Sequence, residues 1–188
     1  MRRIGLSFWI MGGWLLSIGP SVGWAQEAIS AEAQAALKQT DTQDLYEQQV
    51  AFMRLEMLRE PATAPLIRPY LDHRRAETRA FSIRALVAVE GTQAIPVVLE
   101  RLKKDRSPYV RVSAILALEP FRAHDPAILP AFVSALRDRS REVRIAAIDA
   151  VGQINDPQAR EALRVRARRE RDRDVQRVLN EVMSKRDG

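Results

Sequence analysis

The chain has 188 residues, of which 46% are hydrophobic and 29% charged, and its 30 basic residues outnumber 24 acidic ones to give a net charge of +6. This length suits one domain and is sufficient to bury a hydrophobic core. The sequence contains no cysteine, which excludes disulfides, thiol catalysis and the attachment of a lipid to cysteine.

The first 25 residues have the pattern of a secretory signal peptide. Arg2 and Arg3 precede an uncharged apolar stretch at 4–18, and Gly23 and Ala25 are the small residues expected just before a cleavage site. We therefore expect export, into a bacterial periplasm, with cleavage near Ala25. The alternative is an uncleaved anchor, and only then do we expect membrane contact. The stretch is shorter than the roughly 20 residues of a membrane span.

Removal of this segment changes the inventory of the chain. Residues 1–25 hold two arginines and no acid, so 28 basic residues would remain against 24 acids. The segment also contains every tryptophan of the chain (Trp9, Trp14 and Trp24). Because few aromatic residues are left, we expect no aromatic-lined pocket for a small molecule.

Two helices are expected next, over residues 30–39 and 42–60. Leu45, Phe52 and Leu55 have a rough helical spacing in the second of them. We interpret residues 26–61 as an N-terminal helical cap on the domain that follows.

The rest of the chain repeats at intervals of 32 to 33 residues. Val110 and Val143 occupy the same place in two similar segments, 107–121 and 140–154, and steps of 32 lead back to Thr78 and on to Val175. A period of this length is typical of stacked-repeat proteins. We place four repeats at about residues 62–91, 92–122, 125–155 and 156–186, within a repeat domain over 62–188.

Each repeat predicts a hairpin of two helices. In the second helix of one repeat, Val143, Ala147, Ala150, Val151 and Ile154 lie at i, i+4, i+7, i+8 and i+11, which places apolar side chains on one helix face. The first helices are expected at 65–71, 96–102 and 130–136. Their boundaries are marked by capping residues before proline and by a terminal glycine: Ser107-Pro108, Asp125-Pro126, Asp156-Pro157 and Gly91.

A single hairpin cannot bury both of its faces, so the repeats must stack. Small residues recur where neighbouring helices would meet: Ala85, Ala114, Ala117, Ala147 and Ala150. The expected fold class is all-α, a solenoid of stacked helical hairpins.

This pattern resembles the HEAT repeat and, more narrowly, the short HEAT-like repeat of the phycobilisome lyase type. The resemblance covers about residues 62–186 and is carried best by one copy: Leu136, Asp138, Val143, Arg144, Ala147, Ala150, Val151, Gly152, Asp156 and Pro157. It implies a helical scaffold but no particular activity, since such repeats serve many unrelated functions.

The resemblance also implies a structural ladder, in which a turn aspartate and a helix arginine bond within and between repeats. The pairs expected are Asp105 with Arg111 and Asp138 with Arg144, with Asp72 and Arg79 as a looser first copy. The alternative is that these residues contact a ligand. The last repeat has Glu170 and Gln176 in the two places, which suits a terminal repeat with no neighbour to bond.

Candidate catalytic groups are sparse. His73 and His124 lie in different repeats without metal-ligand neighbours, and no glycine-rich loop precedes a helix. We expect no catalytic residue, no metal, no cofactor and no enzymatic activity.

Residues 159–174 form the most basic stretch, including Arg164, Arg166, Arg168 and Arg169. One interpretation is a site for an anionic partner, such as an acidic protein, a phospholipid surface or nucleic acid. The other is a polar terminal helix that keeps the end of the array in solution. Nucleic acid is not expected for an exported chain.

The function predicted is a non-catalytic scaffold that binds a protein partner, of acidic character if the basic stretch is used, through a concave surface lined by the second helices. Arg84, Leu116 and Asp149 share one exposed offset there and differ in chemistry. The alternatives are a chromophore handler similar to the bilin lyases, an enzyme accessory subunit, and a supporting subunit of an assembly.

Overall fold

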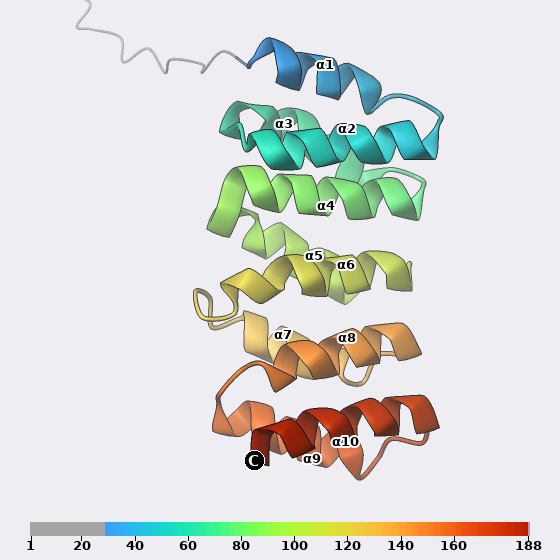
Figure 1. The fold of residues 1–188 in the computed structure, drawn as a ribbon, viewed down its shortest axis with the longest axis vertical. Helices are drawn as coiled ribbons and strands as arrows, with labels where there is room; N and C mark the ends of the chain where they lie inside the picture. The colour runs from blue at the N-terminus through green and yellow to red at the C-terminus, as the bar shows by residue number, and fades with distance from the viewer. Residues whose placement is uncertain (1–28, 188) are drawn as a thin grey trace, which may run out of the picture.

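The fold was analysed in a computed structural model that describes residues 29–187. These residues form helices and turns and no strand. Figure 1 shows a stack of hairpins in which α2, α4, α6, α8 and α10 form one layer, and α3, α5, α7 and α9 form the layer behind it. The fold class predicted from the repeat, an α-solenoid of helical hairpins, is confirmed.

The N-terminal pair consists of α1 (Ala31–Gln39) and α2 (Leu45–Leu58). The remaining second helices are α4 (Ala76–Glu90), α6 (Pro108–Leu118), α8 (Arg141–Gly152) and α10 (Arg173–Asp187). The first helices are α3 (Ala64–Ile67), α5 (Ile95–Lys104), α7 (Ile128–Ala135) and α9 (Pro157–Ala167). Each second helix packs on the next, from α2 through α10, so the layer is continuous.

The core lies between the two layers, and its described members run from Ala33 to Leu179. Of the five small residues predicted at helix contacts, Ala85, Ala114, Ala147 and Ala150 are buried, whereas Ala117 is only half-buried. Leu86, Leu118 and Val151, from three successive repeats, are fully covered as well. Hydrophobic burial of this kind is the main favourable contribution to folding.

Helix boundaries follow the capping residues in most places. The Asp156 side chain accepts from the N–H groups of Gln158 and Ala159, with Pro157 as the first residue of α9. Gly91 ends α4 with a φ of 57°, a conformation that favours glycine.

Two boundary predictions were wrong in detail. α7 begins at Ile128 instead of directly after Asp125, because the Asp125 side chain accepts from the N–H of Ala127 (2.8 Å) and forms a turn first. Ser107 makes no side-chain cap on α6, and its own N–H donates to Asp105 Oδ1 at 2.8 Å.

The first helix of the first repeat is broken into three short pieces. A three-residue 3₁₀ turn, Pro61–Thr63, precedes α3, and a five-residue 3₁₀ turn, Arg68–Asp72, follows it. Pro69 explains the second break, because proline lacks an N–H and cannot continue an α-helix. The sequence predicted an uninterrupted helix at 65–71.

One stretch of the described residues, Ala76–Lys104, has the length and hydropathy of a membrane-spanning helix. It comprises α4 and α5, which are separated at Gly91, and both helices pack against α6 in the stack. The predicted signal peptide lies outside the described residues.

Candidate functional site

A ladder of arginines joins consecutive hairpins. Arg79, Arg111 and Arg144 lie one repeat apart on α4, α6 and α8, and each donates through Nε and Nη2 to a carboxylate of the following repeat. The Arg111 bonds to Asp138 measure 2.8 and 2.7 Å. Nη1 of each arginine donates to a main-chain carbonyl six residues earlier, in its own repeat. The arginines are therefore positioned by the fold itself.

This pairing corrects the one expected from the sequence. Arg111 contacts the main-chain oxygen of Asp105, and the Asp105 carboxylate belongs to Arg79, at 2.8 Å through both nitrogens. Likewise, Arg144 contacts the main-chain oxygen of Asp138, and the Asp138 carboxylate accepts from Arg111. The reason is local, because each aspartate folds over its own turn to accept an N–H two residues ahead. Its oxygens then face the preceding repeat.

The ends of the ladder also differ from the prediction. His73, and not Asp72, occupies the first turn position, where its Nδ1 accepts from the Arg75 N–H at 3.1 Å. Asp72 is exposed and pairs with Arg101 instead. At the other end Glu170 replaces aspartate and still accepts from Arg144 at 3.0 Å, so this terminal unit does bond to its neighbour. Gln176 Nε2 donates to the Glu170 carbonyl at 2.7 Å. It therefore makes the main-chain contact of a ladder arginine without the contact to a carboxylate.

The ladder controls the acidity of its carboxyl groups. Burial raises the pKa of Asp105 and Asp138, but bonds from the arginine and from a serine N–H outweigh burial, and both pKa values fall below the usual range. For Glu170 burial is likewise outweighed, by bonds from the Asp172 N–H, from Arg166 and from the Arg171 N–H, which lower the pKa to about 2. The ladder is therefore charged across the range from weakly acidic to neutral pH.

Two grooves open on the layer of second helices, and they contain the three residues predicted to share an exposed offset. Arg84, Leu116 and Asp149 are all exposed, on α4, α6 and α8 respectively. Arg84 and Leu116 line a groove of about 770 Å³ between α4 and α6, and Leu116 and Asp149 line one of about 810 Å³ between α6, α8 and α10. Leu116, at 54% exposure, belongs to both grooves.

The α4–α6 groove is lined mainly by apolar side chains, among them Phe81, Val87, Tyr109 and Phe121. Tyr109 is 49% exposed at its edge. The expectation that no pocket would gather aromatic residues was wrong, since this groove draws three of them from two successive repeats. Arg59, Arg84 and Glu56 are its charged lining residues, and because Arg84 pairs with Glu56 at 3.0 Å, the excess positive charge of the groove is that of one arginine.

The α6–α8–α10 groove has an acidic side. Burial raises the pKa of Glu119, and the nearby Asp149 carboxylate raises it further. Burial also raises the pKa of Asp149. A raised pKa means that these carboxylates are less stable as charged groups here than in water, and a cation placed beside them would stabilise them. Lys185 lines the same groove.

Tyr109 and Glu119 also line the grooves, and neither was predicted from the sequence. A signal for Tyr109 existed, because the same offset is acidic in the other repeats (Glu77, Glu142 and Asp174) and aromatic only there. No comparable signal marked Glu119, whose equivalents are Val87 and Gly152.

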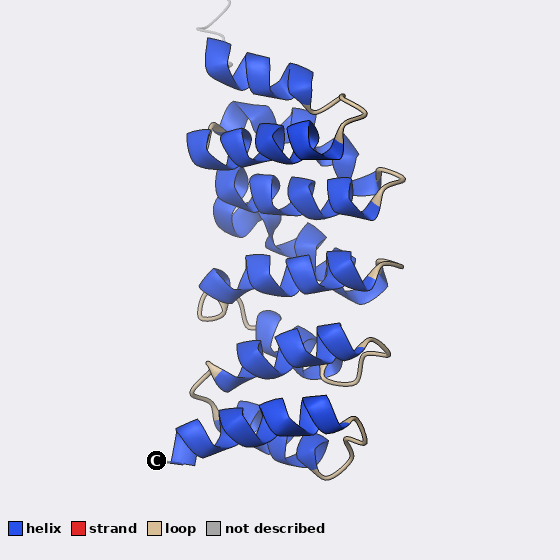
Figure 2. Cartoon of the chain, turned by 45° about the vertical axis from the view of Figure 1, so that its right-hand side comes forward, coloured by secondary structure: helices blue, strands red, loops and turns tan. Residues whose placement is uncertain are grey.

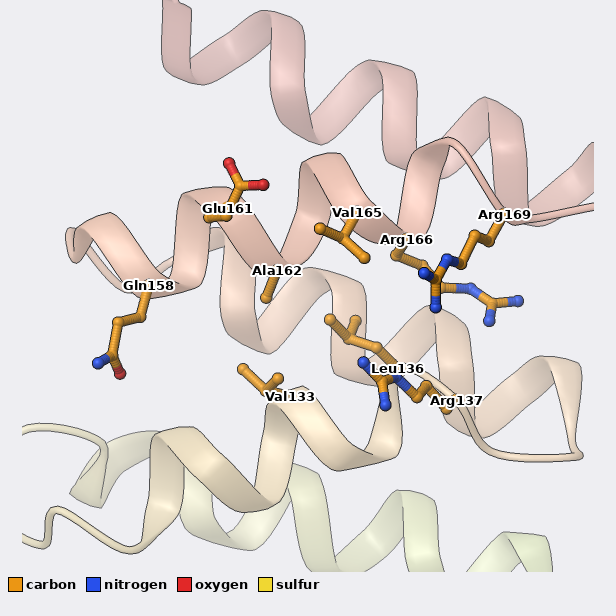
Figure 3. A pocket seen from close by; sticks show the side chains of 9 residues that line it. All are labelled: Val133, Leu136, Arg137, Gln158, Glu161, Ala162, Val165, Arg166 and Arg169. Atoms are coloured by element: carbon orange, nitrogen blue, oxygen red, sulfur yellow. The ribbon is translucent and has the colours of Figure 1, made fainter.

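The basic stretch at the C-terminal end is divided by the fold. A groove of about 480 Å³ lies between α7 and α9. Figure 3 shows Val133, Leu136, Ala162 and Val165 toward its middle and Arg137, Arg166 and Arg169 together at one end. Arg166 is bonded to Glu170, while Arg164 and Arg168 are exposed and outside the groove lining. The four predicted arginines therefore do not form one site.

The histidines do not come together. His73 lies in the ladder, and burial together with Arg74, Arg75 and Arg79 lowers its pKa. His124 is exposed beside Phe121. Within the described residues no group of three or more His, Asp or Glu side chains could hold a metal ion.

These features define the class of protein. It is an α-solenoid in which arginine–carboxylate pairs join consecutive hairpins and grooves open on the layer of second helices. The family of HEAT repeats matches residues 33–119 and 95–184. The chain belongs to this family, as the resemblance in its sequence indicated.

The comparison with curated proteins finds none that matches the chain. Among solved structures, the chain is similar to one described as the complex of CpcE and CpcF of phycocyanin lyase from Nostoc sp. PCC7120. The identity is 20%, the TM-score is 0.64, and the match covers 81% of this chain and 98% of the other. At this identity the similarity concerns the fold, and it agrees with the narrower resemblance to phycobilisome lyase repeats at that level.

Proposed function

We propose that the chain is an exported, non-catalytic HEAT-repeat scaffold that binds a protein partner across the grooves of its second-helix layer. The observation that carries this proposal is the junction at Leu116. Leu116 and Tyr109 are both about half exposed, at 54% and 49%. Leu116 lines both grooves, and Tyr109 lines the α4–α6 groove beside it. Large apolar side chains exposed beside a groove are typical of surfaces that bind another protein.

The shape and charge of the two grooves favour a helical segment as the bound element. An amphipathic helix places apolar anchors in such a groove at i, i+4 and i+7. Arg59 and Arg84 lie toward α2, whereas Glu119 and Asp149 lie toward α8, so a partner helix with acidic residues at one end and basic residues at the other would match both. The similar solved structure is itself a complex of two proteins, which supports a protein partner.

The test is a crosslinking capture with residues 26–188, which contain every helix of the described stack. A photoreactive side chain at position 109 would label the partner in the cell envelope of the source organism. We expect one dominant protein, and we expect Leu116→Arg to abolish its capture. Leu66→Arg is the matched control, because Leu66 is 47% exposed but lies on α3 in the other layer. Equal loss with both variants, or no loss with either, would argue against the second-helix layer.

A second candidate function is a chromophore handler or an enzyme accessory subunit. It is favoured by the fold similarity to a phycocyanin lyase complex and by the aromatic residues in the α4–α6 groove. Titration with a bilin tests it directly. A shifted absorption band that is lost in Phe121→Ala would support a chromophore handler, and an unchanged spectrum would remove that candidate and leave the accessory subunit to the capture experiment.

A further inference from the structure

A second row of arginines runs along the turn edge of the stack. The residue directly after each ladder position is an arginine in all four repeats: Arg74, Arg106, Arg139 and Arg171. All four are exposed and lie in the turns that lead into α4, α6, α8 and α10. Figure 2 shows these turns stacked above one another along the right-hand edge. We call this set the arginine row.

The side chains of the row are partly ordered by the stack. Arg106 Nη2 donates to the carbonyl of Arg74 at 3.2 Å, and Arg139 Nη2 donates to the carbonyl of Arg106 at 3.3 Å. Each of these guanidinium groups therefore reaches back to the equivalent turn of the preceding repeat. A partner would meet cations whose positions are already restricted, which reduces the entropy lost on binding.

The row has no carboxylate partner among the described side chains. Acids close to the row are used elsewhere: Asp105, Asp138 and Glu170 accept from the ladder arginines, Asp72 pairs with Arg101, Glu100 with Lys104 and Asp174 with Arg141. The repeats thus contain two kinds of arginine, those of the ladder and those of the row, which lie roughly one helical turn from each other in the sequence. The ladder arginines are buried or half-buried and bonded to carboxylates, whereas the row arginines are exposed and have no carboxylate partner among the described side chains.

We propose that the arginine row binds an extended, acidic segment of a protein partner. The charges follow a line along the stack, which fits a linear partner better than a flat one. Packed helices lie about 8–10 Å apart, so successive arginines repeat at about that distance. A polyproline II segment rises about 3.1 Å per residue with three residues per turn, so every third side chain recurs on one face at about 9 Å. An acidic residue at every third position would therefore meet the row in register.

This surface lies at the helix ends, apart from the grooves of the second-helix layer. The proposal does not depend on the function proposed for those grooves, and Leu116→Arg should leave it intact. It is also distinct from the basic stretch at 159–174, from which it takes only Arg171.

The experiment measures binding of fluorescent peptides to residues 26–188 by anisotropy at low salt. The probe is a (Glu-Pro-Pro)₄ peptide, and the control peptides are (Gln-Pro-Pro)₄ and one of the same composition as the probe with its four glutamates adjacent. We expect the spaced acidic peptide to bind most tightly, and raising the salt to 0.15 M, where the Debye length is about 8 Å, to weaken it. Equal binding of the spaced and clustered peptides would overturn the register argument.

The variant is a quadruple Arg→Gln replacement at positions 74, 106, 139 and 171. Its matched control removes the same charge at Arg54, Arg122, Arg160 and Arg164, which are exposed but off the row. We expect the row variant to lose about tenfold or more in affinity and the control to lose far less. Arg→Lys at the four row positions should retain most of the binding, because it keeps the charge. Melting curves would establish that all variants fold.

A vesicle arm distinguishes a membrane surface from a peptide. Sedimentation with phosphatidylserine vesicles should give at most weak binding that both charge-removal variants reduce alike. Row-dependent binding to vesicles without binding to the spaced peptide would replace this proposal with a lipid surface.

Discussion

Arg111 on α6 and Asp138 in the turn before α8 form a two-bond ion pair between consecutive repeats, with Nε–Oδ2 at 2.8 Å and Nη2–Oδ1 at 2.7 Å. Their side chains are only 5% and 16% exposed. The same guanidinium holds the Asp105 carbonyl of its own repeat, so one side chain links two turns. A pair of this kind fixes the register in which the hairpins stack.

Arg111→Ala should therefore destabilise the fold strongly. The replacement leaves the Asp138 carboxylate and the Asp105 carbonyl without their donor, and we expect a loss of about 3 kcal/mol in the free energy of unfolding. Urea denaturation followed by circular dichroism measures it. The comparison is Arg122→Ala, an exposed arginine in the same repeat, which should change stability by less than about 1 kcal/mol. Similar small losses for both would mean that the ladder does not hold the array together.

The ladder also shows which features of the fold could be predicted from the sequence and which could not. The period of 32 to 33 residues and the helical spacing within it predicted the stacked hairpins, because both depend on local pattern. The partner of each arginine depends on which way an aspartate faces, and this follows from a turn geometry that spacing alone does not reveal. For the same reason the sequence predicted Asp72 at the first ladder position, which His73 occupies in the structure. The His73 ring nitrogen accepts the turn N–H in place of a carboxylate.

The candidate site was less predictable than the fold. The offset shared by Arg84, Leu116 and Asp149 follows from the repeat, and the sequence located these residues on one exposed layer. The grooves between them depend on side chains from adjacent repeats that leave space unfilled. Phe81, Tyr109 and Phe121 come together only after α4 and α6 have packed.

Stability should fall in acid through a step that belongs to Glu170. Its pKa is lowered from 4.5 to about 2, so the carboxylate stabilises the fold fully above pH 4.5, and this contribution is lost as the pH falls from 4.5 toward 2. Asp105 and Asp138, whose pKa values are also lowered, act in the same direction. Urea midpoints measured between pH 7 and pH 2 should decline accordingly.

Glu170→Gln tests the assignment of that step. The variant should be less stable than the wild type at pH 7 by about 1–3 kcal/mol, because Arg144 and Arg166 lose a charged acceptor. The difference should shrink as the pH falls below 4.5, and the two proteins should converge at about pH 2. Glu161→Gln is the control, since Glu161 is exposed on α9 and makes no side-chain bond in the described structure. A constant difference between Glu170→Gln and the wild type at every pH would contradict the assignment.

Gly152→Ala should destabilise the C-terminal end of the array, although alanine is normally the better helix former by roughly 0.5–1 kcal/mol. A Cβ at position 152 would overlap Cγ1 of Val182, which packs from α10 against the end of α8. Valine is stiff at χ1, so the overlap requires the helices to move, at a cost of about 1–3 kcal/mol. Thermal melts measure the loss. The double variant with Val182→Ala should recover most of it, and a failure to recover would place the strain elsewhere.

Asp149→Asn should have opposite effects on stability and on binding. The pKa of Asp149 is raised by burial, so its carboxylate is disfavoured in the fold, and its cost appears above the ordinary pKa and disappears as the pH falls below it. The amide removes this cost, and we expect a gain below about 1 kcal/mol at pH 7 and none at pH 3. If a basic residue of the partner occupies the α6–α8–α10 groove, the same variant should weaken capture. Stability and partner capture, measured on one preparation, separate the two effects. A variant that is both more stable and fully competent in capture would show that the acidic side of this groove serves no partner.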